Sequence, residues 1–219
     1  MSSFRVKGGN KLSGSITPQG AKNEALQIIS AVLLTDQKVT IHKIPNIRDV
    51  MKLIDLLADL GVKVNKIAEE SYEFQADSIN LDFMDSPEFK EKGGALRGSI
   101  MILGPLLSRF GTAKMPKPGG DKIGRRRVDT HFFGFEKLGA RFNYDSKTSF
   151  YTVDGSNLKG AYMHLEEASV TGTANIVMAA VMAEGDTTIY NAACEPYLQQ
   201  LCGMLNRMGA KIEGVGSNL

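Results

Sequence analysis

Leu57-Ala58-Asp59-Leu60-Gly61-Val62-Lys63-Val64 is the first of three related octapeptides in a chain of 219 residues. The other two are Phe135-Glu136-Lys137-Leu138-Gly139-Ala140-Arg141-Phe142 and Leu205-Asn206-Arg207-Met208-Gly209-Ala210-Lys211-Ile212. Each predicts a helix that closes on a glycine in the C′ position. The basic residue flanked by apolar ones after each glycine predicts a short strand. Repetition of one unit is therefore the organising feature of this chain.

A second set of similar segments marks where the units begin. They are Gly20-Ala21-Lys22-Asn23, Gly94-Ala95-Leu96-Arg97 and Gly172-Thr173-Ala174-Asn175. Each precedes a mostly apolar stretch that predicts a helix, at residues 21–34, 95–108 and 173–183. Each helix is followed by a short β-like run, at 39–41, 112–115 and 187–190. Amphipathic second helices are predicted at 49–60, 128–138 and 196–208, and additional strands at 72–75 and 150–153.

The first helix of each unit is apolar nearly all round, which is typical of a helix that is buried on every side. The second helix is amphipathic and is expected to lie outside it. We therefore predict an α/β fold in which three units pack around buried helices and the sheets lie on the exterior. The units are placed at about 20–93, 94–171 and 172–219, within one domain of residues 20–219.

Composition excludes several classes of protein. With 26 Lys and Arg against 24 Asp and Glu, the net charge of +2 argues against a nucleic-acid-coating protein. The two cysteines, Cys194 and Cys202, are too few for a disulfide framework or a four-ligand zinc site. No metal-ligand spacing and no glycine-rich nucleotide loop occurs, so we predict neither metal nor cofactor. Residues 1–10 lack the apolar core of a signal peptide, and no apolar run could cross a bilayer, which favours a cytoplasmic protein without a membrane partner.

The segment from Lys114 to Arg127 carries six basic residues and one acidic residue. Its local charge of +5 leaves −3 for the rest of the chain. Glycines and prolines predict a loop, and Arg side chains on such a loop suit bidentate binding of phosphate or carboxylate. The loop leads into a helix near Val128, whose N-terminus adds N–H donors for an anion. A solvated basic loop and a polyanion-binding patch remain the alternatives to a site for a small anion.

Lys22 and Asn23 open the first buried helix, and Arg97 has the equivalent place in the second. A cation at a helix N-terminus is disfavoured by the helix dipole, and a bound anion would compensate for it. The alternative is a lysine whose amine simply extends to water. His131 follows Arg127 by one helical turn and is expected to border the same anion site.

Several longer stretches match one known family. They are Phe4-Arg5-Val6-x-Gly8 with Leu12-x-Gly14, Gly20-Ala21-Lys22-Asn23, Pro118-Gly119-Gly120-x-x-Ile123-Gly124-x-Arg126-x-Val128-Asp129-x-His131, and Ser169-Val170-Thr171-Gly172-Thr173. The chain resembles, over its whole length, the UDP-N-acetylglucosamine 1-carboxyvinyltransferases among the enolpyruvyl transferases. The resemblance implies an inside-out α/β barrel of two domains, each built of three βαβαββ units around buried helices. This chain would be the N-terminal half, with residues 1–19 packing against the second domain.

The resemblance also implies an activity and its partners. The enzymes transfer enolpyruvate from phosphoenolpyruvate to the 3′-hydroxyl of UDP-N-acetylglucosamine, release phosphate, and so begin bacterial peptidoglycan synthesis. Asp121 would be the general acid, with Lys22 and Arg126 as further catalytic residues. The implied substrate-binding residues are Lys22, Asn23, Arg97, Arg126, Arg127, Val128, Asp129, Thr130, His131, Ser169, Val170 and Thr171. Because the active site of these enzymes lies between two domains, this chain alone is expected to bind the nucleotide sugar weakly and to be inactive.

Four positions depart from the pattern of the resembling enzymes. One is Arg48, which replaces a lysine and keeps its charge but not its geometry. Asp121 replaces a loop cysteine that the epoxide antibiotic fosfomycin alkylates, so we predict an active, fosfomycin-resistant variant. Glu167 replaces a lysine at the diphosphate site, which puts that contact in doubt. Arg127 replaces a proline and offers an additional phosphate contact.

Two other functions are compatible with the sequence. A shikimate 3-phosphate enolpyruvyl transferase would share the fold but not the loop pattern of Arg126, Val128, Asp129 and His131. A non-catalytic UDP-sugar-binding module would keep the anion site without the reaction.

Overall fold

The computed structural model describes residues 3–119 and 127–219. In it, the glycines of the three octapeptides all have positive φ angles, 105° at Gly61, 95° at Gly139 and 110° at Gly209. After each glycine an N–H group donates to a carbonyl five residues earlier, as Val62 does to Leu57 at 2.9 Å. This is the Schellman arrangement, which needs a left-handed residue that glycine adopts without strain. The three predicted helix ends are confirmed.

The described elements form three successive units, but their boundaries differ from the predicted ones. Residues 81–93 begin the second unit and residues 162–164 begin the third, whereas the predicted boundaries placed them in the first and second. The first contains α1 (Lys22–Ala31) with the 3-10 helix η1 (Val32–Leu34), β1 (Lys38–Ile41), α2 (Arg48–Asp59), β2 (Lys63–Ala68) and β3 (Ser71–Gln75). The second contains the 3-10 helix η2 (Leu81–Asp85), α3 (Pro87–Gly94), the 3-10 helix η3 (Arg97–Ile102), α4 (Leu103–Phe110), β4 (Thr112–Pro116), α5 (Asp129–Lys137), β5 (Arg141–Asp145) and β6 (Phe150–Asp154). The third contains β7 (Tyr162–His164), α6 (Val170–Ala180), β8 (Thr188–Tyr190) and α7 (Pro196–Arg207).

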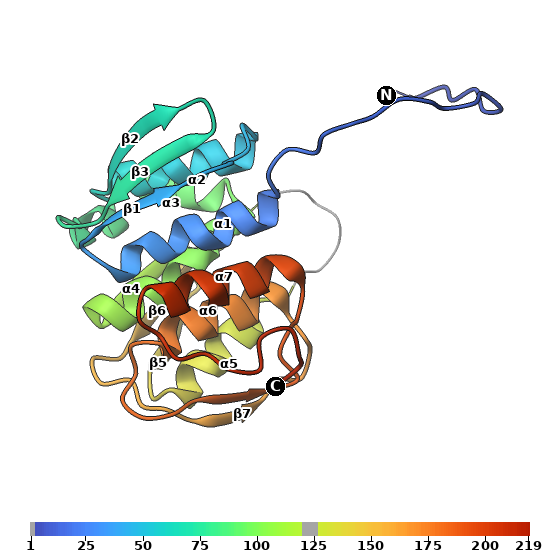
Figure 1. Cartoon of the computed structure of the whole chain (residues 1–219). Helices are drawn as coiled ribbons and strands as arrows, with labels where there is room; N and C mark the ends of the chain where they lie inside the picture. The colour runs from blue at the N-terminus through green and yellow to red at the C-terminus, as the bar shows by residue number, and fades with distance from the viewer. Residues whose placement is uncertain (1–2, 120–126) are drawn as a thin grey trace.

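The sheets lie outside the inner helices, as predicted. Figure 1 shows the β1-β3-β2 sheet at one end of the molecule and β7 at the other, with α1 and α6 between them. In the first two units the last strand is central and antiparallel to both neighbours. Phe74 of β3 pairs with Val39 and Val64, and Val153 of β6 pairs in the equivalent way in the β4-β6-β5 sheet. Both side chains are fully buried, so each sheet faces the helical core.

The strand predicted after the third octapeptide is not formed. Residues 210–212 pair with no strand in the described chain, and the Asn206 side chain instead binds both backbone groups of Ile212, at 2.7 and 2.9 Å. A groove of about 900 Å³ is lined by both β8 and residues 210–212. In the first unit the corresponding place between β1 and β2 is taken by β3. The prediction was wrong because a strand needs a partner as well as a suitable sequence.

Two helix starts differ from prediction for local reasons. The helix predicted from residue 173 begins at Val170, because the Ser169 hydroxyl accepts a hydrogen bond from the Gly172 N–H and caps it. The helix predicted at 95–108 begins as η3 and becomes α-helical only at Leu103. Sequence analysis missed α3 altogether, although Ser86 as N-cap and Pro87 at the first helical position are a recognised start signal.

Residues 3–19 are exposed and contain no helix or strand, and Figure 1 shows them extending away from the helices and sheets. Four apolar side chains in this segment, Phe4, Val6, Leu12 and Ile16, are each at least 87% exposed. Its packing against a second domain stays a prediction. None of the helices that the structure describes is long and apolar enough to cross a membrane.

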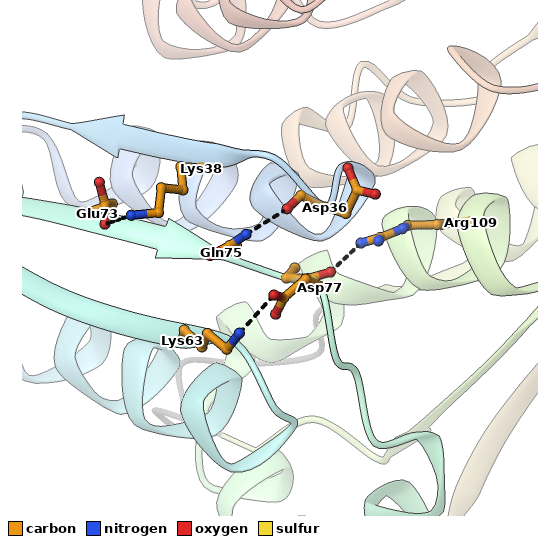
Figure 2. Close-up of polar contacts among 8 residues, drawn as sticks. Asp36, Lys38, Lys63, Glu73, Gln75, Asp77 and Arg109 are labelled. Carbon is orange, nitrogen blue, oxygen red and sulfur yellow. Dashed lines mark hydrogen bonds and ion pairs between the residues drawn. The ribbon is translucent and has the colours of Figure 1, made fainter.

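Arg109 of α4 joins the second unit to the first. Its Nη1 atom donates to three backbone carbonyls, those of Leu33 (3.0 Å), Thr35 (3.0 Å) and Ala76 (2.7 Å). Figure 2 shows the guanidinium directed from α4 to the end of β3. The carbonyls lie at the end of η1 and just after β3, where no helical or ladder partner remains for them. One half-buried cation thus satisfies three backbone groups of another unit.

We expect Arg109→Leu to lower the free energy of unfolding by about 2–4 kcal/mol, since the substitution leaves three carbonyls without their donor. The matched control is Lys38→Leu, which removes the exposed pair of Lys38 with Glu73 (3.1 Å), also drawn in Figure 2, and should cost less than about 1 kcal/mol. Urea denaturation measures both. Equal losses in the two variants would contradict the role given to Arg109.

Candidate functional site

The N-terminal ends of η3, α5 and α6 meet at one place, and most of the described residues predicted to bind substrate lie there. Arg97 at the start of η3 donates from Nη2 to the Arg127 carbonyl at 2.9 Å, just before α5. His131 in α5 contacts Thr171 in α6, with 3.2 Å between Nε2 and Oγ1. The middle of α1 packs against η3, since a Cβ atom on Gly98 would lie 2.9 Å from Leu26.

Two predicted catalytic residues, Asp121 and Arg126, lie outside the described residues, because the structure describes nothing between Gly119 and Arg127. Their roles stay predictions.

Lys22 opens α1, and its amine lies 3.2 Å from the carboxylate of Asp49 in the first turn of α2. Both side chains are partly exposed, at 44% and 41%. Asn23 beside it is exposed. The carboxylate is favoured by the dipole of α2 and compensates the cation at the start of α1. In this structure Asp49 therefore supplies the negative charge for which sequence analysis invoked a bound anion.

Arg127 is held by two carboxylates. Its Nε atom donates to Asp129 at 2.7 Å, and its Nη2 atom donates to Glu166 at 3.3 Å. These hydrogen bonds, that to Asp129 most, raise the pKa of the guanidinium. The side chain is about half exposed, so its charge is available to a ligand that replaces one of the carboxylates.

A cavity of about 330 Å³ lies beside Arg127. Its lining consists of Arg127, Val128, Asp129, Thr130, Phe132, Phe133, Glu136, Phe142, Tyr151 and Glu166. Three of the rings are close together: the Phe132 and Phe142 centroids are 4.0 Å apart, and those of Phe132 and Tyr151 are 4.9 Å apart. Partial burial raises the pKa of the Tyr151 hydroxyl. An aromatic wall beside a guanidinium can accept a planar ring that carries an anionic group.

The start of α6 forms another side of the site. Ser169 is its N-cap and Thr171 is exposed in the first turn, while Val170 between them is partly buried. Glu167, which stands where the resembling enzymes have a lysine, accepts a hydrogen bond from the Thr130 hydroxyl at 3.3 Å. A carboxylate repels phosphate, whereas a lysine would attract it, and the effect of Glu167 on a diphosphate contact stays a prediction.

His131 does not line this surface. It is 1% exposed, and both of its ring nitrogens have partners, Asn175 Nδ2 at 2.9 Å and Thr171 Oγ1 at 3.2 Å. Burial first, and then the nearby charge of Arg97, lower the pKa of His131 to about 3. His131 is thus a neutral, enclosed group that contacts the exposed surface only through Thr171, rather than a side chain open to an anion.

Sequence analysis gave no functional role to Asp49, Glu166, Asn175 or the aromatic rings. The signal for Asn175 was present, since an amide in a helix that is apolar nearly all round needs hydrogen-bond partners. Asp49 and Glu166 carried no such signal, because their partners are distant in sequence. In residues 3–119 and 127–219, no group of three or more His, Cys, Asp or Glu side chains could hold a metal ion.

Comparison with known proteins gives one family. Residues 6–219 match the family described as EPSP synthase (3-phosphoshikimate 1-carboxyvinyltransferase). The chain is 63% identical to a protein named UDP-N-acetylglucosamine 1-carboxyvinyltransferase from Porphyromonas gingivalis. It is 60% and 48% identical to proteins of the same name from Bacteroides fragilis and Borreliella burgdorferi. Each alignment covers 100% of this chain and 50% of the relative. The chain therefore spans about half the length of the curated relatives that it matches.

Solved structures show the same fold. The enolpyruvyl transferase NikO from Streptomyces tendae matches with a TM-score of 0.77 at 18% identity, over 96% of this chain and 48% of that one. EPSP synthase from Acinetobacter baumannii matches with a TM-score of 0.68, also at 18% identity, over 92% of this chain and 46% of that one. The predicted enolpyruvyl transferase fold, an α/β inside-out barrel, is confirmed.

The burial of His131 predicts how stability depends on pH. Because the pKa of His131 is about 3 in the folded chain and about 6.5 in the unfolded one, only the unfolded chain gains a proton as the pH falls below about 6.5. Folding stability is therefore lost on acidification. From pH 7 to pH 5 this residue alone should lower the free energy of unfolding by about 2 kcal/mol.

Urea denaturation at both pH values measures this loss, with His131→Gln as the comparison. The variant should show a smaller fall between pH 7 and pH 5, whatever its absolute stability. An unchanged pH dependence in the variant would contradict the assignment.

Proposed function

Since the chain belongs to the EPSP synthase family of enolpyruvyl transferases, we propose that it is part of an enzyme that transfers enolpyruvate from phosphoenolpyruvate to the 3′-hydroxyl of UDP-N-acetylglucosamine. The observation that carries the choice of acceptor is the 63% identity, over the whole chain, to a relative named for that reaction. The product begins peptidoglycan synthesis in the cytoplasm. The remainder of the active site belongs to a second domain, which the doubled length of the relatives supports.

The proposed reaction is an addition followed by an elimination. The sugar hydroxyl loses its proton and bonds to C2 of phosphoenolpyruvate while C3 gains a proton, which gives a tetrahedral ketal. The bond from C2 to the phosphate oxygen then breaks, inorganic phosphate leaves, and C3 loses a proton to restore the double bond. Such a pathway needs a proton donor at C3 and cations around the carboxylate and phosphate.

The proposed roles are those implied by the resemblance to the UDP-N-acetylglucosamine 1-carboxyvinyltransferases. Asp121 is proposed as the proton donor, and Lys22, Arg97 and Arg126 as the cations that bind phosphoenolpyruvate. Asn23 is proposed to contact the sugar. The UDP portion is assigned to Arg126 through His131 and to Ser169, Val170 and Thr171, with His131 acting from the interior. The aromatic cavity beside Arg127 supports this assignment, because a nucleotide combines a planar base with anionic phosphates.

For an anion to bind, the cations must change partners. Lys22 is paired with Asp49, and Arg127 with Asp129 and Glu166. These exposed pairs are weak individually, so a phosphate or carboxylate can replace the carboxylates at modest cost. Lys22 and Arg127 are thereby held close to the site before substrate arrives.

Shikimate 3-phosphate is the second candidate acceptor, because the family description names that reaction. A UDP-sugar-binding module without catalysis is the third. The three differ in what they bind and in whether phosphate is released.

The test joins this chain to the C-terminal half of the Porphyromonas gingivalis relative and measures phosphate release from phosphoenolpyruvate. We expect release with UDP-N-acetylglucosamine and none with shikimate 3-phosphate. Lys22→Ala should lower kcat/KM about a hundredfold or more, since it removes a cation from developing negative charge, while Lys38→Ala on β1 should leave it unchanged.

Release only with shikimate 3-phosphate would establish the second candidate. A folded fusion that binds UDP-N-acetylglucosamine but releases no phosphate with either acceptor would favour the non-catalytic module.

Fosfomycin resistance is tested on the same fusion. A carboxylate at position 121 offers no thiolate to the epoxide, so intact-mass analysis with UDP-N-acetylglucosamine present should show no adduct. Asp121→Cys should gain one adduct and become sensitive. An adduct on the peptide that contains Asp121 in the unaltered protein would refute the prediction.

A further inference from the structure

The strongest unexplained feature is a chain of buried hydrogen bonds that ends at an exposed hydroxyl of the site. It runs from the backbone of η3 and α4 through Asn175 and His131 to Thr171. We propose that His131 is a positioning residue of the UDP-sugar site, which directs the Thr171 hydroxyl to donate a hydrogen bond to a diphosphate oxygen. The ligand in this inference rests on the function proposed above.

The orientation of the Asn175 amide is fixed by its two backbone partners. The Gly104 N–H can only donate, and it lies 2.7 Å from Asn175 Oδ1. The Ile100 carbonyl can only accept, and it lies 2.8 Å from Asn175 Nδ2. A flipped amide would set donor against donor and acceptor against acceptor at once. The Asn175 Nδ2 atom therefore has one hydrogen left, and it points to His131 Nδ1 at 2.9 Å.

This contact fixes the tautomer of His131. Because the Asn175 amide donates, His131 Nδ1 must accept and carries no proton. The neutral ring then has its proton on Nε2. That proton is directed to Thr171 Oγ1, 3.2 Å away, so Thr171 accepts from His131 instead of donating to it.

The hydroxyl proton of Thr171 is consequently left for another acceptor. In the part of the chain that the structure describes, Thr171 Oγ1 has no second hydrogen-bond partner. Thr171 is exposed in the first turn of α6, where backbone N–H groups also favour an anion. A hydroxyl that already accepts one hydrogen bond becomes a stronger donor in the next.

Charges around His131 support a neutral ring. Among the described residues, Arg97 on η3 is a charged group whose field reaches the ring, and this field opposes a second proton. The tautomer set by Asn175 is thus maintained at neutral pH.

The first test needs no ligand. Long-range ¹H–¹⁵N spectra of the uniformly labelled chain report which imidazole nitrogen is protonated. His131 should show a pyrrole-type Nε2 and a pyridine-type Nδ1 that do not change between pH 8 and pH 5. His42 and His164 are exposed and serve as reference signals. A proton on His131 Nδ1 would overturn the inference.

The second test measures affinity of the chain for UDP-N-acetylglucosamine and for uridine by titration calorimetry or NMR. Thr171→Val should lower the affinity for the nucleotide sugar about tenfold and leave the affinity for uridine unchanged, because uridine lacks the diphosphate. Thr171→Ser retains the hydroxyl and should stay within about threefold. Equal binding by Thr171→Val and the unaltered chain would overturn the inference and leave the proposed function intact.

The role of His131 is separated from a structural one by His131→Asn. Its Oδ1 atom can still accept from Asn175, but the shorter side chain does not reach Thr171. We expect weaker binding of the nucleotide sugar, by about threefold or more, and no further loss when the change is combined with Thr171→Val. His131→Gln, which can donate at the Nε2 position, should restore affinity.

The positioning role would be overturned if the losses of affinity from His131→Asn and Thr171→Val were fully additive in the double variant. It would also be overturned if a folded His131→Asn chain bound the nucleotide sugar with unchanged affinity. An unaltered chain that binds neither UDP-N-acetylglucosamine nor uridine would overturn the proposed function as well.

Discussion

The insertion of one side-chain amide into a helix is the interaction on which the arrangement of the core depends. In a continuous α-helix the Gly104 N–H would donate to the Ile100 carbonyl four residues earlier. Asn175 of α6 lies between these two groups and bonds to both. The following residue, Pro105, has no N–H to offer, so the helical ladder is already interrupted there. The change from η3 to α4 occurs at this insertion, which is a known cause of helix irregularity.

The same amide requires the helices to approach closely. A Cβ atom on Gly104 would lie 2.3 Å from the backbone oxygen of Asn175, so no larger residue fits. At the next residue of α6, a Cβ atom on Gly134 of α5 would lie 2.2 Å from Ile176. Glycines thus bring α4 and α5 against α6 from two sides. His131 can reach both Asn175 and Thr171 only because of this spacing.

What could be predicted from the sequence was mainly local or repeated. The octapeptide glycines specify helix ends through backbone conformation alone, and the three copies agree in the structure. The prediction of a strand after Gly209 was wrong because a strand needs a distant partner, and in the described chain residues 210–212 have none. In the site, too, local features could be predicted and contacts between distant residues could not. Sequence analysis placed Lys22 and Arg97 at predicted helix starts. The pairing of Lys22 with Asp49 and of Arg127 with Glu166, however, joins residues 27 and 39 positions apart. The burial of His131 likewise depends on the packing of α5 against α6 rather than on its neighbours in sequence.

The carbonyl contacts of Arg109 have a consequence for how this domain comes apart. In a linear repeat array each unit contacts only its neighbours, so terminal units can fray independently. Here Arg109 links the second unit to the first, Asn175 links the third to the second, and α7 of the third packs on α1 of the first. The three interfaces close a ring, and no unit is terminal. Loss of any one unit exposes two interfaces at once. We therefore expect partial unfolding to be costly and the three units to open together in hydrogen exchange.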